Sequence, residues 1–223
     1  DPSQYRDTWS DFLEYLEELT GRKVQFFSAH SNAAQIEAMR AGRLHIAGFS
    51  TGAVPLAVNC AGFVPLAMMA EGDKYGYEME LITHVDSGIE SIEDIRGRTL
   101  AFTSPTSNSG FKTPKVLLED FGLVADVDYE AAYSGGHDNS LIGVHRRDYD
   151  VAAVANEVTN RIMDRGRVPR EEIRVLYTSD TFPTTAFGAA YNLTPELTAA
   201  IEKAFLTFPW EGSSLAEEFP ADR

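Results

Sequence analysis

The stretch TLAFTSPTSNSGFKTPKVLLEDF, residues 99–121, contains the pattern that organises the whole sequence. Its first five residues, 99–103, are mostly apolar or β-favouring and predict a short strand. Ser, Thr, Asn, Pro and Gly then crowd into residues 104–110, which predicts a turn. From about Ser109 to Phe121, apolar residues return at helical spacing. The stretch therefore predicts one strand–turn–helix unit of an α/β protein.

The same alternation recurs on both sides of this unit. Short connections between helices and strands are typical of a parallel sheet covered by helices. Such a layout normally begins with a strand, whereas this sequence begins with a helix, so we expect the native protein to extend upstream of Asp1. Strands are predicted at 24–28, 44–48, 78–85, 99–103, 129–133, 150–154, 174–177 and 186–191, and helices at 6–20, 32–41, 91–97, 109–121, 137–146, 157–164 and 195–205.

Two segments, 78–85 and 178–186, divide the alternation into two groups of elements. We therefore predict two α/β lobes with mainly parallel sheets, joined by two crossing strands that act as a hinge. Lobe 1 is expected to comprise residues 1–80 together with 184–223, and lobe 2 residues 81–183.

The composition excludes several classes of partner. The 223 residues include 19 Lys and Arg against 34 Asp and Glu, a formal net charge of −15 at pH 7. Such a surface repels nucleic-acid phosphates and anionic lipid headgroups, so we expect no nucleic-acid partner. The apolar run from Gly52 to Ala70 is interrupted by Pro55, Asn59 and Pro65. It predicts a short helix followed by a strand, and not a membrane span.

Neither disulfide nor metal chemistry is indicated. Cys60 is the single cysteine, lies in an apolar run without a CxxC partner, and is predicted to pack in the core. The five histidines show no H-x-H or H-E-x-x-H spacing. We therefore expect no metal and no cofactor.

Two predicted strand-to-helix turns carry hydrogen-bond donors. In the first, SPTSNSGF at 104–111, hydroxyl and backbone N–H groups converge at a helix N-terminus, which is the physical outline of an anion site. The second, SGGHDNS at 134–140, places His137 in the first helical turn, where a cationic or N–H-donating imidazole can bind an anion. Open α/β sheets bind ligands at such turns, so the pair predicts one anion site.

Each turn also has a purely structural interpretation. Ser107 or Ser109 can cap its helix without touching a ligand, and a single histidine is commonly structural. The first turn lacks the Gly-Lys-Ser spacing of a Walker A loop. A hydrolase built from Ser107 or Ser109 with His137 and Asp138 is disfavoured, because G-x-S-x-G is absent and side chains adjacent on a helix point in different directions.

The chain resembles the phosphonate- and phosphite-type periplasmic solute-binding proteins of ABC transporters. The resemblance is carried by segments 106–111 and 134–140, by their separation of about 30 residues, and by the sequence KYGY at 74–77. The resemblance covers nearly the whole chain. It implies a type II, Venus-flytrap α/β fold that closes over a small phosphorus oxyanion and catalyses no reaction. It also implies that the ligand oxygens contact a Ser/Thr-rich helix N-terminus and a histidine, here Ser107, Asn108, Ser109 and His137.

The resemblance implies further ligand contacts. Tyr77 corresponds to a pocket tyrosine, and Phe49 to a second pocket aromatic whose usual hydroxyl it lacks. Glu157 matches a carboxylate that contacts the amino group in aminoalkylphosphonate binders, although a first-turn acid favoured by the helix dipole explains it equally well. Thr185 stands where a second amine-binding Asp is expected. Phosphite, phosphate and other phosphonates therefore stay open as ligands.

We accordingly expect a monomeric periplasmic protein that delivers its ligand to the membrane permease of an ABC transporter. The net charge of −15 does not oppose this expectation, because amides, hydroxyls and one imidazole can bind an oxyanion locally while surface charges are screened. One alternative is a ligand-sensing extracytoplasmic domain of a signalling protein with the same pocket. An enzyme on the same fold is the other.

Overall fold

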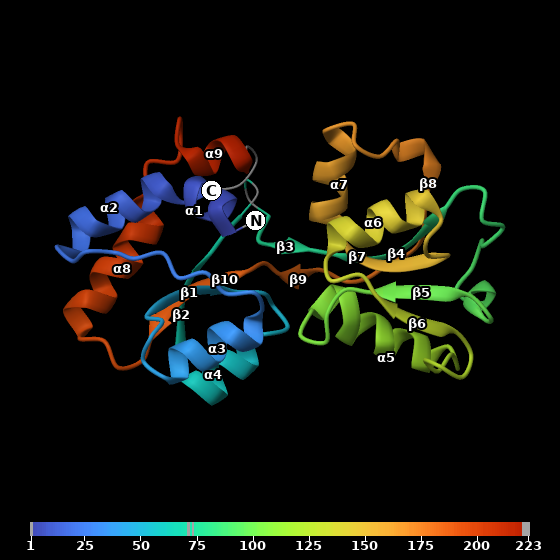
Figure 1. Cartoon of the computed structure of the whole chain (residues 1–223), viewed down its shortest axis with the longest axis horizontal. Helices are drawn as coiled ribbons and strands as arrows, with labels where there is room; N and C mark the ends of the chain where they lie inside the picture. Colours follow the sequence, from blue (N-terminus) through green and yellow to red (C-terminus); the bar gives the residue numbers. More distant parts are fainter. Residues whose placement is uncertain (1, 71, 73, 220–223) are drawn as a thin grey trace. The chain divides into compact units, whose positions relative to one another are not determined.

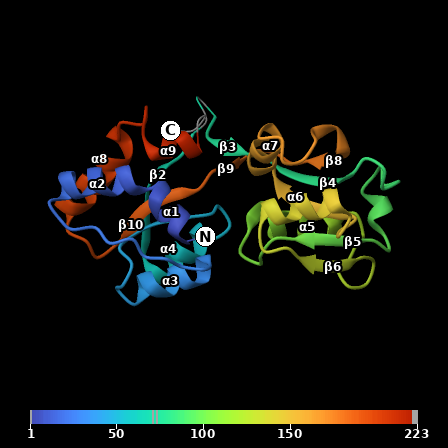
Figure 2. The same cartoon turned by 45° about the horizontal axis from the view of Figure 1, so that its top comes forward.

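The computed structural model describes residues 2–70, 72 and 74–219, which form two compact units (Figure 1). Unit 1 comprises residues 1–75 and 184–223, and unit 2 comprises residues 76–183. The chain passes between the units twice, at 75/76 and at 183/184. Within unit 2, the segments next to these passages form a short antiparallel pair, β3 (Gly76–Tyr77) with β9 (Phe182–Pro183) (Figures 1 and 2).

Unit 2 is built on a five-stranded mixed sheet in the order β6-β5-β7-β4-β8. The three strands β5, β6 and β7 are parallel, whereas β4 pairs antiparallel with both β7 and β8. The bounds are β4 (Met79–His84), β5 (Thr99–Phe102), β6 (Glu130–Tyr133), β7 (Val151–Ala155) and β8 (Ile173–Thr178).

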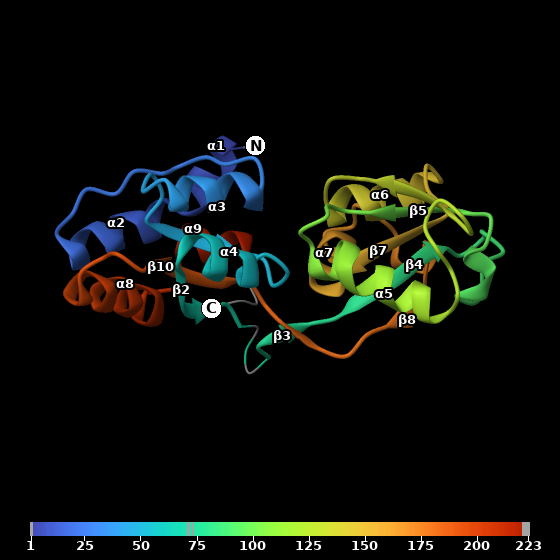
Figure 3. The same cartoon turned by 90° about the horizontal axis from the view of Figure 1, so that it is seen from below.

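Alternate residues of these strands enter two separate cores, as the two-residue period of a strand requires. Leu100 and Phe102 pack in the core that also contains Leu118 of α5, whereas Ala101 between them packs in the core of α6 and α7. Figure 3 shows α5 in front of the sheet, and Figure 1 shows α6 and α7 together on the other face. The helices are η2, a π-helical turn (Asn108–Lys112), α5 (Thr113–Asp120), α6 (His137–Arg146) and α7 (Asn156–Asp164), with short 3₁₀ turns η1 (Glu93–Ile95) and η3 (Arg170–Glu172).

Unit 1 has a three-stranded antiparallel sheet in the order β1-β10-β2, covered by helices on both faces. One core contains residues of α3 and α4, and the other contains residues of α2, α8 and α9. The elements are α1 (Pro2–Thr8), α2 (Ser10–Thr20), α3 (Asn32–Arg40), β1 (Ile46–Phe49), α4 (Val54–Ala61), β2 (Phe63–Met68), β10 (Ala186–Ala190), α8 (Pro195–Thr207) and α9 (Ser214–Glu218).

The expectation of mainly parallel sheets is wrong, and the strand order explains why. Strands joined by a helix do run parallel, as β1 and β2 or β7 and β8 do, because a crossover helix returns the chain to the same edge. In each unit, however, an antiparallel strand is inserted between such a pair: β10 in unit 1 and β4 in unit 2. Both inserted strands follow a passage of the chain from the other unit.

The strand expected at 24–28 is also not formed, since the structure shows no ladder for residues 23–29. A strand is stabilised by its partner, and β1 pairs with β10 alone within the described part of the chain. The backbone N–H of Val24 instead donates to Glu17 Oε1 (2.6 Å). Phe26 and Phe27 both remain exposed. Apolar alternation without a neighbouring strand therefore leaves this segment irregular.

Cys60 was expected in the core but lies exposed on α4. The buried positions of this helix are Ala57 and Ala61, so Cys60, one residue before Ala61, falls on the outer side. The apolar sequence around Cys60 therefore did not determine which of its side chains are buried.

Candidate functional site

Three strand-to-helix turns lie side by side at one edge of the unit 2 sheet. They follow β5, β6 and β7, whose carboxyl ends meet at the same edge because the three strands are parallel. The backbone N–H of Gly135 in the second turn donates to the carbonyl of Thr103 in the first (3.1 Å). The N–H of Ala155 in the third turn donates to the ring of His137 (3.1 Å). Residues 103–112, 134–137 and 155–157 thus form one connected group, called the three-turn site below.

The first turn begins the helix through its serine. Ser107 Oγ accepts the backbone N–H of Gly110 (3.0 Å), so this hydroxyl is a helix cap. Capping uses only the oxygen lone pair, and the hydroxyl hydrogen can still be donated to an anion. Ser109 is buried, and the Nδ2 of Asn108 is a buried donor without a hydrogen-bond partner. The turn therefore combines a structural cap with donors that an anion could use.

Close packing against β5 holds this turn in place. Gly110 lies so near the strand that a Cβ atom built on it would stand 1.9 Å from Thr103 Oγ1. Its carbonyl accepts the backbone N–H of Thr103 (2.9 Å). Only glycine permits this approach. The turn then enters the helix through the π-helical residues 108–112, an irregularity that is frequent at functional sites.

The second turn leaves its helix N-terminus without a side-chain cap. Gly135 has a φ of 85°, which favours glycine, and Gly136 in the N-cap position has no side chain to offer. Ser134 Oγ is engaged elsewhere, with Ser140 Oγ (2.7 Å) and the carbonyl of Gly136 (2.9 Å). The N–H groups of His137, Asp138 and Asn139, which precede the first intrahelical bond from Ser140 N–H to the Gly136 carbonyl (3.0 Å), are therefore available to an external acceptor.

His137 is held as a neutral hydrogen-bond donor. Its Nδ1 accepts the N–H of Ala155, so in the neutral ring the hydrogen resides on Nε2. Burial lowers the pKa of His137 from 6.5 to about 4, although the charge of Asp138 acts in the opposite direction. Of the two forms that the sequence allows, the structure therefore favours the N–H-donating imidazole over the cation.

Positive charge is sparse in the three-turn site. Its one Lys or Arg is Lys112, the last residue of η2, and residues 103–111, 134–137 and 155–157 contain neither residue type. The turns themselves therefore attract an anion through hydrogen bonds from amides, hydroxyls and the neutral imidazole.

Glu157 and Tyr77 occupy the third turn and the strand leading to β4. Glu157 is exposed in the first turn of α7, where the helix dipole favours an acid. Tyr77 on β3 is largely buried, and its ring centroid lies 6.0 Å from that of Phe182. Both belong to unit 2, as do the four residues expected in the first two turns.

Phe49, the remaining predicted contact, belongs to unit 1 and has no exposed surface. It packs edge-on against Phe63, with ring centroids 4.9 Å apart, in the core beneath α3 and α4. Packing therefore accounts for Phe49, and we leave it out of the ligand contacts proposed below. Thr185 is half-buried just before β10.

The arrangement of His137 opposes a hydrolytic role. In a catalytic triad the histidine donates from Nδ1 to a carboxylate and keeps Nε2 free as the base. Here Nδ1 accepts a backbone N–H, so Nε2 carries the proton and cannot accept one from a serine. The site is built to bind through N–H and O–H groups.

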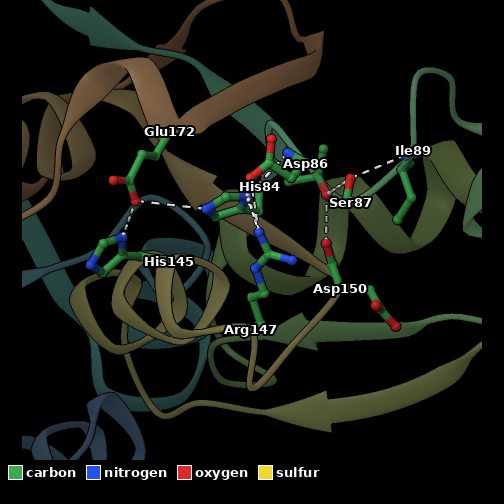
Figure 4. A network of polar contacts seen from close by, with 9 residues as sticks. His84, Asp86, Ser87, Ile89, His145, Arg147, Asp150 and Glu172 are labelled. Atoms are coloured by element: carbon green, nitrogen blue, oxygen red, sulfur yellow. Dashed lines mark hydrogen bonds and ion pairs between the residues drawn. The ribbon is translucent and has the colours of Figure 1, made fainter.

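A second group of titratable side chains lies at the opposite end of α6 (Figure 4). His145 Nδ1 lies 2.9 Å and His84 Nε2 3.6 Å from Glu172 Oε2. His84 Nδ1 faces two donors, the N–H of Asp86 (3.1 Å) and Arg147 Nη2 (3.3 Å), so Nε2 carries the hydrogen and offers no lone pair to a metal. Among residues 2–70, 72 and 74–219 the structure contains no group of three His, Cys, Asp or Glu side chains arranged to hold a metal ion.

Comparison with known proteins shows the family of this chain. Residues 1–223, the whole chain, match the family described as "ABC transporter, phosphonate, periplasmic substrate-binding protein". The chain belongs to this family. It is thus a member of a non-enzymatic family of periplasmic binding proteins, with the α/β type II fold, two units and mixed sheets. The fold expected from the two motifs is confirmed, apart from the direction of the strands.

Three similar proteins carry related descriptions. The phosphate-import protein PhnD of Mycolicibacterium smegmatis is 29% identical over 215 residues, and the phosphonates-binding periplasmic protein of Escherichia coli is 25% identical over 205 residues. The matches cover 91% and 90% of this chain, and 67% and 61% of those proteins. PhnD1 of Prochlorococcus marinus, solved with methylphosphonate, superposes with a TM-score of 0.86 at 14% identity, covering 99% of this chain and 86% of that one.

Two features of the site carry no sequence signal. The Ala155 N–H that selects the His137 tautomer is a backbone group, so no residue type marks it. The contact of Thr103 with Gly110 depends on how the turn folds back onto β5.

Within the described residues, no helix is both long enough and apolar enough to cross a bilayer.

Proposed function

We propose that this protein, acting as a monomer, captures a small phosphorus oxyanion in the three-turn site and delivers it to the permease of an ABC transporter. The observation that carries the proposal is the fixed state of His137, a half-buried neutral imidazole whose Nδ1 is occupied by a backbone N–H and whose Nε2–H is left to donate. Two neighbouring helix N-termini direct further donors to the same edge of the sheet.

Each residue of the first two turns has a defined part in this proposal. The hydroxyls of Ser107 and Ser109, the Nδ2 of Asn108, the first N–H groups of α6 and the Nε2–H of His137 donate to the oxygens of the ligand. Such bonds from neutral donors to an ionised acceptor are short and strong when water is excluded. The acidic surface does not oppose them, because its charges are screened beyond about 8 Å at physiological salt.

The substituent on phosphorus would be read by Tyr77 and Glu157. A tyrosine ring can pack against an organic group, and a carboxylate at this position favours a hydrogen-bond donor on the ligand and disfavours a bare dianion. The descriptions of the relatives name phosphate, phosphonates and methylphosphonate, which all share the same tetrahedral oxyanion. We propose this shared group as the ligand class, with methylphosphonate, phosphite and phosphate as its first candidates.

Isothermal titration calorimetry tests the proposal with methylphosphonate, phosphite, phosphate, 2-aminoethylphosphonate and sulfate as probes. We expect wild type to bind at least one phosphorus ligand more tightly than sulfate, and His137→Ala to bind it about ten- to a hundredfold more weakly, the usual loss for a hydrogen bond to a charged group. His145→Ala, on the last turn of the same helix, is the matched control and should bind as wild type does. Equal binding by His137→Ala and wild type would contradict the role of His137.

A further inference from the structure

One asparagine ends the β4–β7 ladder with its side chain. Three hydrogen bonds join Asn156 to Glu78: Asn156 N–H to the Glu78 carbonyl (3.0 Å), Glu78 N–H to Asn156 Oδ1 (3.0 Å), and Asn156 Nδ2 to Glu78 Oε2 (2.8 Å). The pair directly continues the antiparallel register, whose last backbone partners are Met79 and Ala155. Asn156 thus pairs with Glu78 as a strand residue would, although it is the first residue of helix α7.

The turn from strand to helix explains why a side chain is needed here. The carbonyl of Asn156 turns toward the helix, where it accepts Thr159 Oγ1 (3.1 Å), and is not the group that meets β4. Without Oδ1, the half-buried N–H of Glu78 would lose its acceptor, which is costly away from water. The side-chain amide therefore replaces a backbone peptide group at the end of the ladder.

The neighbours of this pair are residues of the three-turn site. Tyr77 precedes Glu78 on the strand leading into β4, and Glu157 follows Asn156. Ala155, on the other side of Asn156, supplies the N–H that fixes the His137 tautomer. The pair consequently sets the relative position of two proposed substituent contacts and of the group that orients the imidazole.

We propose that Glu78 and Asn156 are positioning residues of the binding site, which hold Tyr77, Glu157 and the Ala155 N–H in register so that His137 presents Nε2–H to the ligand. The inference rests on the proposed function for the role of His137, but the contacts that carry it are independent of any ligand.

The hydrogen bond from Asn156 Nδ2 to Glu78 Oε2 can be tested by exchanging the amide and the carboxylate between the two positions. In Asn156→Asp, Oδ1 still accepts the N–H of Glu78, but a carboxylate oxygen replaces Nδ2 and faces Glu78 Oε2, so the end of the ladder opens by like-charge repulsion. In Glu78→Gln, the new amide oxygen can accept from Asn156 Nδ2, so the contact keeps its direction and loses only the charge of its acceptor. In the double variant, the amide at position 78 donates to the carboxylate at position 156, and the contact is restored with its direction reversed.

Calorimetry with methylphosphonate measures the outcome in four variants. We expect Asn156→Asp to bind at least about tenfold more weakly, Glu78→Gln to lose less affinity than Asn156→Asp does, and the double variant to recover most of the affinity lost in Asn156→Asp. The matched control is Asn160→Asp, which adds the same charge one turn along α7, where Arg170 Nη1 donates to the side chain (2.7 Å) and stabilises it. Wild-type binding by Asn156→Asp, or no recovery in the double variant, would overturn the inference.

A second readout needs no ligand. Long-range ¹H–¹⁵N correlation spectra of the histidine rings should show His137 as the Nε2–H tautomer in wild type and in the double variant, and as a mixture of tautomers in Asn156→Asp. If wild type binds no phosphorus ligand, the proposed function fails while these spectra still test the pair. An unchanged His137 spectrum in Asn156→Asp rejects the positioning role. If Asn156→Asp does not fold, folding of the double variant becomes the test. A double variant that does not fold either would also reject the positioning role of the pair.

Discussion

At the scale of single residues, His137 links ligand binding to the pH dependence of stability. Its pKa is lowered to about 4 in the folded protein from an ordinary value of 6.5, so between these values the unfolded chain binds a proton that the folded chain does not. The unfolding free energy therefore contains a contribution from His137 that is complete above pH 6.5 and is lost as the pH falls toward 4. We expect urea denaturation to show a steeper loss of stability over this interval in wild type than in His137→Gln.

His145→Gln serves as the comparison for this measurement, because it removes a histidine from the other end of the same helix. If the unfolding free energies of wild type and His137→Gln run parallel between pH 6.5 and about 4, the burial of a neutral His137 is refuted. A wild-type unfolding free energy that falls relative to that of His137→Gln as the pH decreases agrees with it.

At the scale of elements, the first turn depends on the contact between Gly110 and β5. A methyl group on Gly110 would lie 1.9 Å from Thr103 Oγ1, and Thr103 is buried, so Gly110→Ala should lower the unfolding free energy by about 1–3 kcal/mol, the usual range for overpacking. Removing the obstacle with Thr103→Ala should recover part of the loss. Thermal and urea denaturation of the single and double variants measure both effects.

Gly136→Ala provides the contrast, since the nearest atom to its built Cβ is Asp138 Oδ1 (2.7 Å), the movable end of an exposed side chain. Its φ of −169° is extended backbone that any residue can adopt. We expect this substitution to change stability less than Gly110→Ala does. The reverse order would show that the close approach to β5 is not what limits position 110.

At the scale of the whole molecule, the net charge of −15 bears on how fast an anion arrives, not on how it is held. Repulsion between the acidic surface and an anionic ligand acts over distance and is screened by salt, whereas hydrogen bonds within the site act at contact. We expect the association rate constant for methylphosphonate to rise severalfold from low salt to about 0.15 M, with little change in dissociation. Stopped-flow fluorescence measures both constants, and an association rate that falls with salt would contradict this account.

Local signals in the sequence determined most elements and half of the site. The glycines and His137 in SGGHDNS mark the start of α6, which begins at His137 and ends at Arg146 as expected. Residue types likewise identified the two turns of donors, because caps, glycines and hydroxyls act over a few residues of chain. The short apolar runs at 99–103 and 150–154 correctly indicated strands, and the structure buries both faces of each.

Tertiary structure decided what depends on a partner distant in the sequence. The insertion of β4 and β10 turned the sheets into mixed and antiparallel ones, and residues 24–28 formed no strand because none pairs with them in the described chain. Phe49 became a core residue through Phe63, and the His137 tautomer was set by the Ala155 backbone. Propensities and caps act within one segment, whereas pairing, burial and protonation depend on which segments meet. The sequence alone therefore determined the chemistry offered by the two turns, and only the folded chain decided how that chemistry is oriented.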